Sequence, residues 1–205
     1  MGVAIAVAIA VATMSACAVP HGRHAVDHIP AAGTPSTQHK TYAPYAATGT
    51  VTVPVAAIHQ SGSCWTGSIS VPKPGVYRCL IGNEIADPCF AANTDTAASG
   101  PDRVLCATDP WTPATEVVLT QSLPELPDPA SATIGPWALE LANGARCVLI
   151  TGTVEQVGAV ELNYSCGAPA AAGRLTTMAG LMSVQYSVDD AGPLATVDVT
   201  TAWST

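Results

Sequence analysis

The chain has few aromatic and few charged residues. Aromatic residues make up 5% of its 205 residues, charged residues make up 11%, and phenylalanine occurs once. A core with few large side chains buries little apolar surface per residue, so covalent cross-links become useful. The scarcity of charge, together with 17 glycines and 17 prolines, favours turns and short strands over long helices stabilised by ion pairs.

Clusters of basic residues are also missing. The chain has 7 lysines and arginines against 15 acidic residues, which gives a net charge of −8. Proteins that bind the phosphate backbone of nucleic acids carry a basic surface, so a nucleic-acid partner is excluded. An acidic surface is typical of a domain kept soluble by charge.

The usual catalytic and cofactor motifs are absent from the sequence. No serine lies in G-x-S-x-G, no G-x-x-x-x-G-K phosphate loop occurs, and no C-x-x-C pair is present. A Ser-His-Asp triad within the folded part would depend on His59. We therefore predict no catalytic residue, no metal ligand and no cofactor.

The N-terminus resembles an export signal of the lipoprotein type. Residues 1–16 are apolar and uncharged, and Met14-Ser15-Ala16 precedes Cys17 as in a bacterial lipobox. We expect residues 1–16 to be a signal peptide and Cys17 to carry a diacylglyceryl lipid anchor at the extracytoplasmic face of the plasma membrane. The leader lacks the usual Lys or Arg before its apolar run, so a short uncleaved anchor and simple secretion remain alternatives.

Residues 17–47 form the expected tether, and residues 48–205 form one expected domain. The tether is rich in Ala, Pro, Thr and His and has no apolar period, which is typical of a flexible segment. His21, His24 and His28 have the ligand chemistry for zinc or copper. Nothing in a flexible tether preorganises them, so we expect adventitious metal binding only.

The domain is predicted to be mainly β. The expected fold is a disulfide-stapled antiparallel β-sandwich or open barrel with short strands and little helix. Asn143-Gly144 predicts a hairpin turn, Asp87-Pro88 predicts a turn, and 76–81 predicts a strand or one helical turn. The other expected strands cover 50–55, 64–70, 104–106, 115–120, 137–141, 146–150, 159–164, 182–188 and 194–199.

Six of the seven cysteines follow Cys17, and an even number in an exported chain predicts three disulfides. Sequence alone allows 15 pairings of six cysteines. We favour Cys147–Cys166, then Cys79–Cys89, which leaves Cys64–Cys106. The lack of a C-x-x-C pair argues against a metal site or a redox-active dithiol.

Six short sequence blocks are distinctive when taken together. They are CWTGS (64–68), YRC (77–79), GN (82–83), IADPCF (85–90), WALEL (137–141) and GARC (144–147). These blocks resemble a family of actinobacterial secreted proteins and lipoproteins without an assigned activity. The resemblance covers about residues 60–166 and implies an actinobacterial envelope location and disulfides, but no site residues.

Two carboxylates and four tryptophans are the remaining candidates for function. Glu84 and Asp87 lie three residues apart near Arg78, which suits either paired-carboxylate hydrolysis or a turn with a local ion pair. We favour the turn. We favour burial for Trp65 and Trp137, and Trp111, beside Pro110, is the one to test for exposure; Trp203 completes the set.

We therefore expect a non-catalytic, lipid-anchored domain of the cell envelope that binds a protein partner or a cell-wall component. An envelope hydrolase that uses the carboxylates of the cysteine-rich segment is the first alternative. Convergence of Glu84 and Asp87 in a cleft would favour it. A purely structural envelope protein is the second alternative, and it predicts no pocket and buried tryptophans.

Overall fold

Strands provide all the regular secondary structure of the described residues. The computed structural model describes residues 35–56, 59–92, 102–126, 135–189 and 192–205, which belong to a single unit, Pro35–Thr205. Among these residues no helix is long and apolar enough to cross a membrane. The expected signal peptide, Cys17 and the three tether histidines lie outside the described residues.

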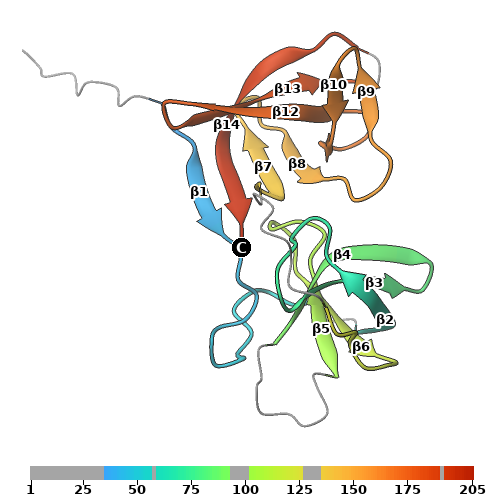
Figure 1. Cartoon of the computed structure of the whole chain (residues 1–205). Coiled ribbons are helices and arrows are strands. Elements are labelled where there is room, and N and C mark those ends of the chain that lie inside the picture. The colour runs from blue at the N-terminus through green and yellow to red at the C-terminus, as the bar shows by residue number, and fades with distance from the viewer. Residues whose placement is uncertain (1–34, 57–58, 93–101, 127–134, 190–191) are drawn as a thin grey trace, which may run out of the picture. The chain divides into compact units, whose positions relative to one another are not determined.

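Five strands close into a barrel, which we call the first barrel (Figure 1). Neighbouring strands are antiparallel, and β2 closes the ring by pairing with β6 in parallel. The barrel lets alternate side chains of each strand point into a shared interior. Its strands are β2 (Gln60–Gly67), β3 (Val76–Ile81), β4 (Glu84–Ala91), β5 (Arg103–Cys106) and β6 (Thr115–Leu119).

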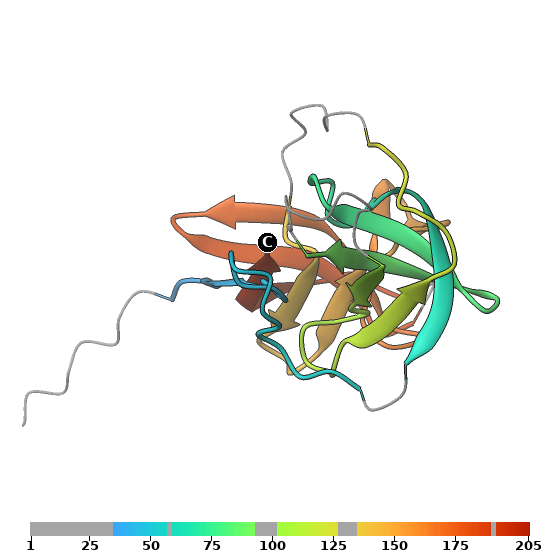
Figure 2. The same cartoon turned by 90° about the horizontal axis from the view of Figure 1, so that it is seen from below.

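The remaining strands form a seven-stranded sheet, which we call the second sheet, and a separate hairpin of β9 (Glu155–Val157) and β10 (Val160–Leu162). Strand β14 pairs with both β13 and β7, so the sheet also returns on itself. Figure 2 shows its strands in colours from yellow-orange to red, apart from the most N-terminal one, which is blue. They are β1 (Gln38–Thr41), β7 (Ala138–Leu141), β8 (Arg146–Leu149), β11 (Tyr164–Ser165), β12 (Ala171–Met178), β13 (Leu181–Ser187) and β14 (Ala195–Ser204).

The prediction of a mainly β, antiparallel and disulfide-bonded fold is confirmed, and so is the hairpin at Asn143-Gly144, which joins β7 and β8. Residues 76–81 form a strand, not a helical turn. Two expectations about local structure are wrong. Residues 50–55 form only isolated bridges, from Val51 to Tyr45 and from Val55 to Ala114. Asp87-Pro88 lies inside β4 as a cis peptide and is not a turn.

The folded domain begins earlier than the expected boundary at residue 48. Strand β1 lies within the segment expected to be tether and pairs in parallel with the end of β14. Thr37 is buried, and its hydroxyl donates to the carbonyl of Val199 at 2.7 Å. Residues 38–41 show no apolar period because β1 is an edge strand whose four residues are all exposed.

All six cysteines of the domain form disulfides, as predicted, but only one pairing was predicted correctly. The bonds are Cys64–Cys79, Cys89–Cys106 and Cys147–Cys166. Cys79–Cys89 is wrong because a register shift between β3 and β4 places Cys79 opposite Ala86. Cys64–Cys106 is wrong because each of these cysteines lies directly opposite another partner, Cys79 on β3 and Cys89 on β4.

A buried aromatic cluster joins the first barrel to the second sheet. Tyr42 packs against Phe90 of β4 with ring centroids 5.6 Å apart, and edge-on against Trp137 at 5.4 Å. Phe90 belongs to the first barrel, whereas Trp137 immediately precedes β7. Nearby, the indole N–H of Trp111 donates to a carboxylate oxygen of Glu140 at 2.7 Å. These contacts hold the two parts together.

The burial of the tryptophans differs in part from the prediction. Trp137 is buried as expected, whereas Trp65 is 46% exposed. Trp65 follows the buried Cys64 on β2, so the alternation of side chains along a strand directs its ring outward, at the point where the register of β2 against β3 shifts. Trp111 is half-buried, because the Arg146 guanidinium lies over its ring at 5.2 Å.

Candidate ligand-binding site

The residues Pro72–Gly75, which we call the proline loop, connect β2 to β3 after a short bend. The N–H of Lys73 donates to the carbonyl of Val71 at 2.8 Å, and the N–H of Val76 donates to the carbonyl of Lys73 at 3.2 Å. Gly75 has a φ of 74°, a left-handed conformation that glycine adopts without steric cost. The two prolines and these bonds give the loop a fixed shape.

A buried carboxylate fixes the segment that precedes the proline loop. The side chain of Asp87 is 1% exposed, and both Ser68 and Ser70 donate their hydroxyls to it. The backbone N–H of Ile69 donates to its second oxygen at 2.9 Å. The Arg78 guanidinium lies 3.8 Å away, so the expected local ion pair is present. Asp87 therefore positions the loop and has no free oxygen facing a cleft.

A pocket of about 450 Å³ opens beside the proline loop, and we call it the loop pocket. This volume is within the range of small-molecule sites. One wall is the end of β2 with the proline loop, and the opposite wall is a segment far along the chain. The lining residues are Thr66, Gly67, Ser68, Pro72, Lys73, Pro74, Gly75, Tyr77, Pro124, Glu125 and Leu126.

The lining of the loop pocket is mainly apolar with a few polar groups. Pro72, Tyr77 and Leu126 supply apolar surface, while Lys73 and Glu125 supply one charge of each sign. Desolvation by partial burial raises the pKa of Tyr77, so its hydroxyl remains protonated at neutral pH and can donate a hydrogen bond. This mixture suits a ligand with an apolar body and one or more polar groups.

A smaller pocket of about 230 Å³ lies on the other side of the proline loop. It shares Lys73, Pro74 and Gly75 with the loop pocket. Its far wall comes from residues 42–47 and from Phe90. The proline loop is thus a ridge with a pocket on each side.

The carboxylates named from the sequence do not converge in this site. Glu84 is exposed where β4 begins, and Asp87 is held by the hydrogen bonds described above. Neither lines the loop pocket or the smaller pocket. Their arrangement therefore agrees with the local ion pair that we favoured, although the expected turn at Asp87 is absent.

His59 lies away from both pockets. Its Nδ1 is 2.9 Å from a carboxylate oxygen of Glu116, and its side chain is 58% exposed. The same oxygen of Glu116 accepts a hydrogen bond from Arg103 at 2.8 Å. Among the described residues these contacts bring no serine or cysteine nucleophile to the histidine, so the group is an exposed ion-pair cluster of the barrel end.

Three cysteine sulfurs of the first barrel lie close enough to share a metal ion. The Sγ atoms of Cys79, Cys89 and Cys106 are all within 4.8 Å of one another. All three are in disulfides, and a disulfide sulfur is not the thiolate that zinc and copper require. The cluster therefore serves as a covalent core in the oxidised protein.

Sequence analysis did not identify the loop pocket. The strand expected at 64–70 was followed no further, although Pro72 and Pro74 around a lysine, followed by a turn glycine, are a signal for a rigid exposed loop. Leu126 offered no signal, because it reaches the pocket from nearly 60 residues along the chain through tertiary folding. The purely structural alternative expected no pocket and buried tryptophans; the described residues form the loop pocket, and among their tryptophans Trp137 is buried whereas Trp65 is exposed.

Comparison with known proteins adds no relative to these observations. No protein-family model, curated protein or solved structure matches the chain. The three disulfides indicate an extracytoplasmic, oxidising location for the domain.

Proposed function

We propose that the protein is a non-catalytic, lipid-anchored domain of the cell envelope that binds an envelope ligand in the loop pocket. The observation that carries the proposal is the loop pocket itself, with about 450 Å³ of space and a largely apolar wall on a rigid loop. A preformed apolar pocket with few polar groups is the usual form of a small-molecule site.

The lack of a convergent pair of acids favours binding over hydrolysis. Paired-carboxylate hydrolysis needs two carboxyl groups that face one substrate across a cleft. Here the Asp87 carboxylate accepts hydrogen bonds from the segment Ser68–Ser70, and Glu84 is exposed at the start of β4. The site therefore offers contacts to a ligand without an acid and a base placed to cleave it.

The location at the membrane is part of the proposal and rests on the leader and Cys17. A diacylglyceryl group on Cys17 would anchor the domain through the segment before Pro35. Replacement of Cys17 by serine is expected to release the protein from the membrane fraction. Retention and processing unchanged in Cys17→Ser would contradict the anchor but leave the pocket proposal intact.

The binding proposal is tested by native mass spectrometry of the protein extracted gently from its own envelope. We expect a discrete additional mass on the intact chain. Gly67→Val provides the matched variant, because a Cβ at Gly67 would lie 3.5 Å from Leu126 and the larger side chain would extend into the pocket. The additional mass should be lost from this variant. A bare protein, or an additional mass that Gly67→Val retains, would contradict the proposal.

Docking of a partner protein is a second candidate, favoured by an exposed apolar face of the first barrel. Leu80 and Ile85 lie directly opposite each other on β3 and β4 and are 41% and 53% exposed, and Trp65 is exposed on β2. Exposed apolar clusters often mark protein contacts. Cross-linking in intact envelopes distinguishes this candidate: a partner lost from Leu80→Ser/Ile85→Ser but retained by Gly67→Val would favour it.

A further inference from the structure

The proline loop carries a lysine whose ammonium group has no partner among the described residues. Within the described residues, the ammonium group of Lys73 makes no hydrogen bond, ion pair or ring contact, although the residue is half-buried. Most other described cations have such a contact: Lys40 with Trp203, Arg78 with Asp87, Arg103 with Glu116 and Arg146 with Glu140. Arg174 also lacks one, but it lies exposed on β12 and lines neither pocket.

Lys73 lies where its charge can contact a bound ligand. Lys73 lines the loop pocket and the smaller pocket at once, on the ridge between them. In a protein with a net charge of −8, carboxylates are available to pair with a surface lysine, yet none lies within ion-pair distance of this one among the described residues. A free ammonium beside an apolar pocket attracts an anionic group of a ligand.

The two pockets beside this charge are lined mainly by apolar side chains. Pro72, Tyr77 and Leu126 line the loop pocket, and Val76 and Phe90 line the smaller one. A purely polar anion would leave these surfaces in contact with water, whereas an amphiphile would bury them. Glu125, the acidic residue of the loop pocket, is exposed, whereas Lys73 is half-buried on the ridge. Charge and shape at the ridge therefore favour a ligand with an acidic group beside Lys73 and an apolar body in the pocket.

We propose that the ligand of the loop pocket is an anionic amphiphile whose acidic group, a carboxylate or a phosphate, pairs with Lys73 while its apolar body fills the loop pocket. The inference rests on the proposed function and specifies its ligand class. The smaller pocket accepts any second apolar group attached near the acid.

Calorimetric titration of the purified, disulfide-bonded protein with four probes, each with a ten-carbon chain, tests the inference. The probes are decanoate, decyl phosphate, decanol and decyltrimethylammonium, each below the concentration at which it aggregates. At least one acid should bind about tenfold tighter than decanol, as expected for one charge-assisted contact, and the cationic probe should bind more weakly still. The tighter of the two acids identifies the acidic group as a carboxylate or a phosphate.

Variants of Lys73 separate the charge from the pocket. Lys73→Gln should remove the difference between the acids and decanol, and Lys73→Arg should retain it. Lys40→Gln is the matched control, because Lys40 lies 4.9 Å from the Trp203 ring and lines neither pocket. It should bind like the unmodified protein.

Two kinds of failure are distinguishable. If decanol binds as tightly as the acids, if Lys73→Gln leaves the acids unaffected, or if neither acid shows saturable binding, the anionic class is wrong. None of these results removes a ligand found by mass spectrometry, so the proposed function would stand. If the acids bind and Gly67→Val does not weaken them, the loop pocket is not their site and the inference fails; the proposed function fails only if the protein from its own envelope carries no additional mass or if Gly67→Val retains that mass.

Discussion

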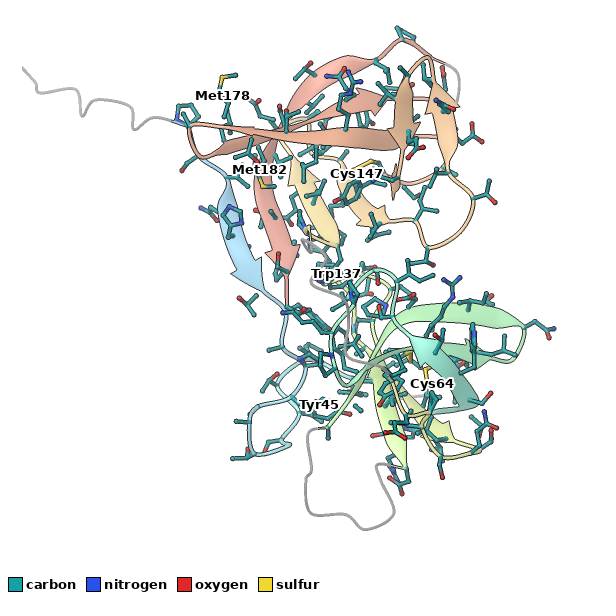
Figure 3. The ribbon with its side chains drawn as sticks, in the orientation of Figure 1. Tyr45, Cys64, Trp137, Cys147, Met178 and Met182 are labelled. Atoms are coloured by element: carbon teal, nitrogen blue, oxygen red, sulfur yellow. A yellow bond between two sulfur atoms is a disulfide. The ribbon has the colours of Figure 1, made fainter. Side chains whose placement is uncertain are left out.

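The interiors of the first barrel and the second sheet are filled with different kinds of side chain. Among the described residues, the buried cluster of the first barrel contains seven residues, of which four are cysteines. The buried cluster of the second sheet contains nine, with one cysteine and with Leu139, Tyr164 and Val199 among the others. Figure 3 labels Cys64 in the barrel and Cys147 in the sheet.

The difference shows two ways to stabilise strands in a chain with few large side chains. The three disulfides span 15, 17 and 19 residues, so each is expected to contribute a similar chain-entropy term of about 3 kcal/mol. Two disulfides stabilise the barrel, whose buried cluster has few aliphatic side chains. One disulfide stabilises the sheet, whose buried cluster consists mainly of apolar side chains. The barrel also carries the loop pocket, so a rigid site is built where packing is sparse.

Removal of one disulfide from each part gives the largest expected contrast. Loss of Cys89–Cys106 through paired alanine substitutions should lower the free energy of unfolding by about 2–5 kcal/mol and speed hydrogen exchange throughout β2–β6. Loss of Cys147–Cys166 should cost less, because Leu139 and its neighbours still fill the sheet. Urea titration with segment-resolved hydrogen exchange measures both. Equal costs, or a larger cost for Cys147–Cys166, would contradict the contrast.

Truncation of aliphatic side chains should show the opposite order. Leu139 is fully buried in the second sheet, and Leu139→Ala should cost about 2–5 kcal/mol. Val117 is fully buried in the barrel, and Val117→Ala should cost only about 1–2 kcal/mol because it removes fewer methyl groups from a core rich in sulfur. Leu80→Ala is the exposed control and should change stability by less than about 0.5 kcal/mol. A Val117→Ala cost above that of Leu139→Ala would show that packing dominates the barrel too.

Alkaline pH should weaken the second sheet through Tyr164. Burial raises the pKa of Tyr164 from 10.0 to about 12, and its hydroxyl donates to the carbonyl of Pro136 at 2.7 Å. The unfolded chain ionises this tyrosine above pH 10 while the folded chain does not, so stability falls as the pH rises from 10 towards 12. Between pH 9 and pH 11 we expect a loss of about 1 kcal/mol from this group.

Tyr164→Phe supplies the comparison for the pH experiment. The variant should lose less stability between pH 9 and pH 11 than the unmodified protein. A residual slope should remain, because burial also raises the pKa of Tyr42 and Tyr45 to about 12. An identical pH profile in the variant would show that Tyr164 does not contribute.

The smallest expected effect concerns the hairpin between β12 and β13. Ala179 has a φ of 50° and is followed by Gly180 with a φ of 83°, as in the hairpin turns that favour Asn-Gly. Ala179→Asn should therefore raise the free energy of unfolding by about 0.5–1 kcal/mol, since asparagine tolerates this conformation better than alanine. Ala142→Asn, at a position without positive φ, should give no gain. No gain at Ala179 either would mean that the turn stores no strain.

The parts of the fold that follow from local pattern were predictable from the sequence. Short strands were expected at β5 and β6, and Asn143-Gly144 identified the hairpin of β7 and β8, because these signals depend only on neighbouring residues. For β3 the local pattern left a strand and one helical turn as alternatives. Strand β12 was missed because its second half, up to Met178, is exposed and irregular and lacks alternation. The disulfide pairing in the barrel depended on a register shift between β3 and β4, which no local pattern reveals.

The candidate site was less predictable than the fold. The sequence suggested Glu84 and Asp87 as candidate catalytic carboxylates. In the folded chain, Asp87 instead accepts hydrogen bonds from the segment Ser68–Ser70 and holds it in place. Lys73 is a candidate binding residue only in the folded chain, where it lines both the loop pocket, which Leu126 helps to form, and the smaller pocket. A pocket is formed by distant segments, so composition and spacing alone do not predict it.

Hydrogen exchange of the purified domain, with and without a lipid-containing extract of its own envelope, tests most directly whether the first barrel is the binding part. We expect the extract to slow hydrogen exchange at residues 66–77 and 124–126, the two segments that contain the lining of the loop pocket. The same extract should leave Gly67→Val unchanged. Protection confined to the second sheet, or no protection anywhere, would contradict the account.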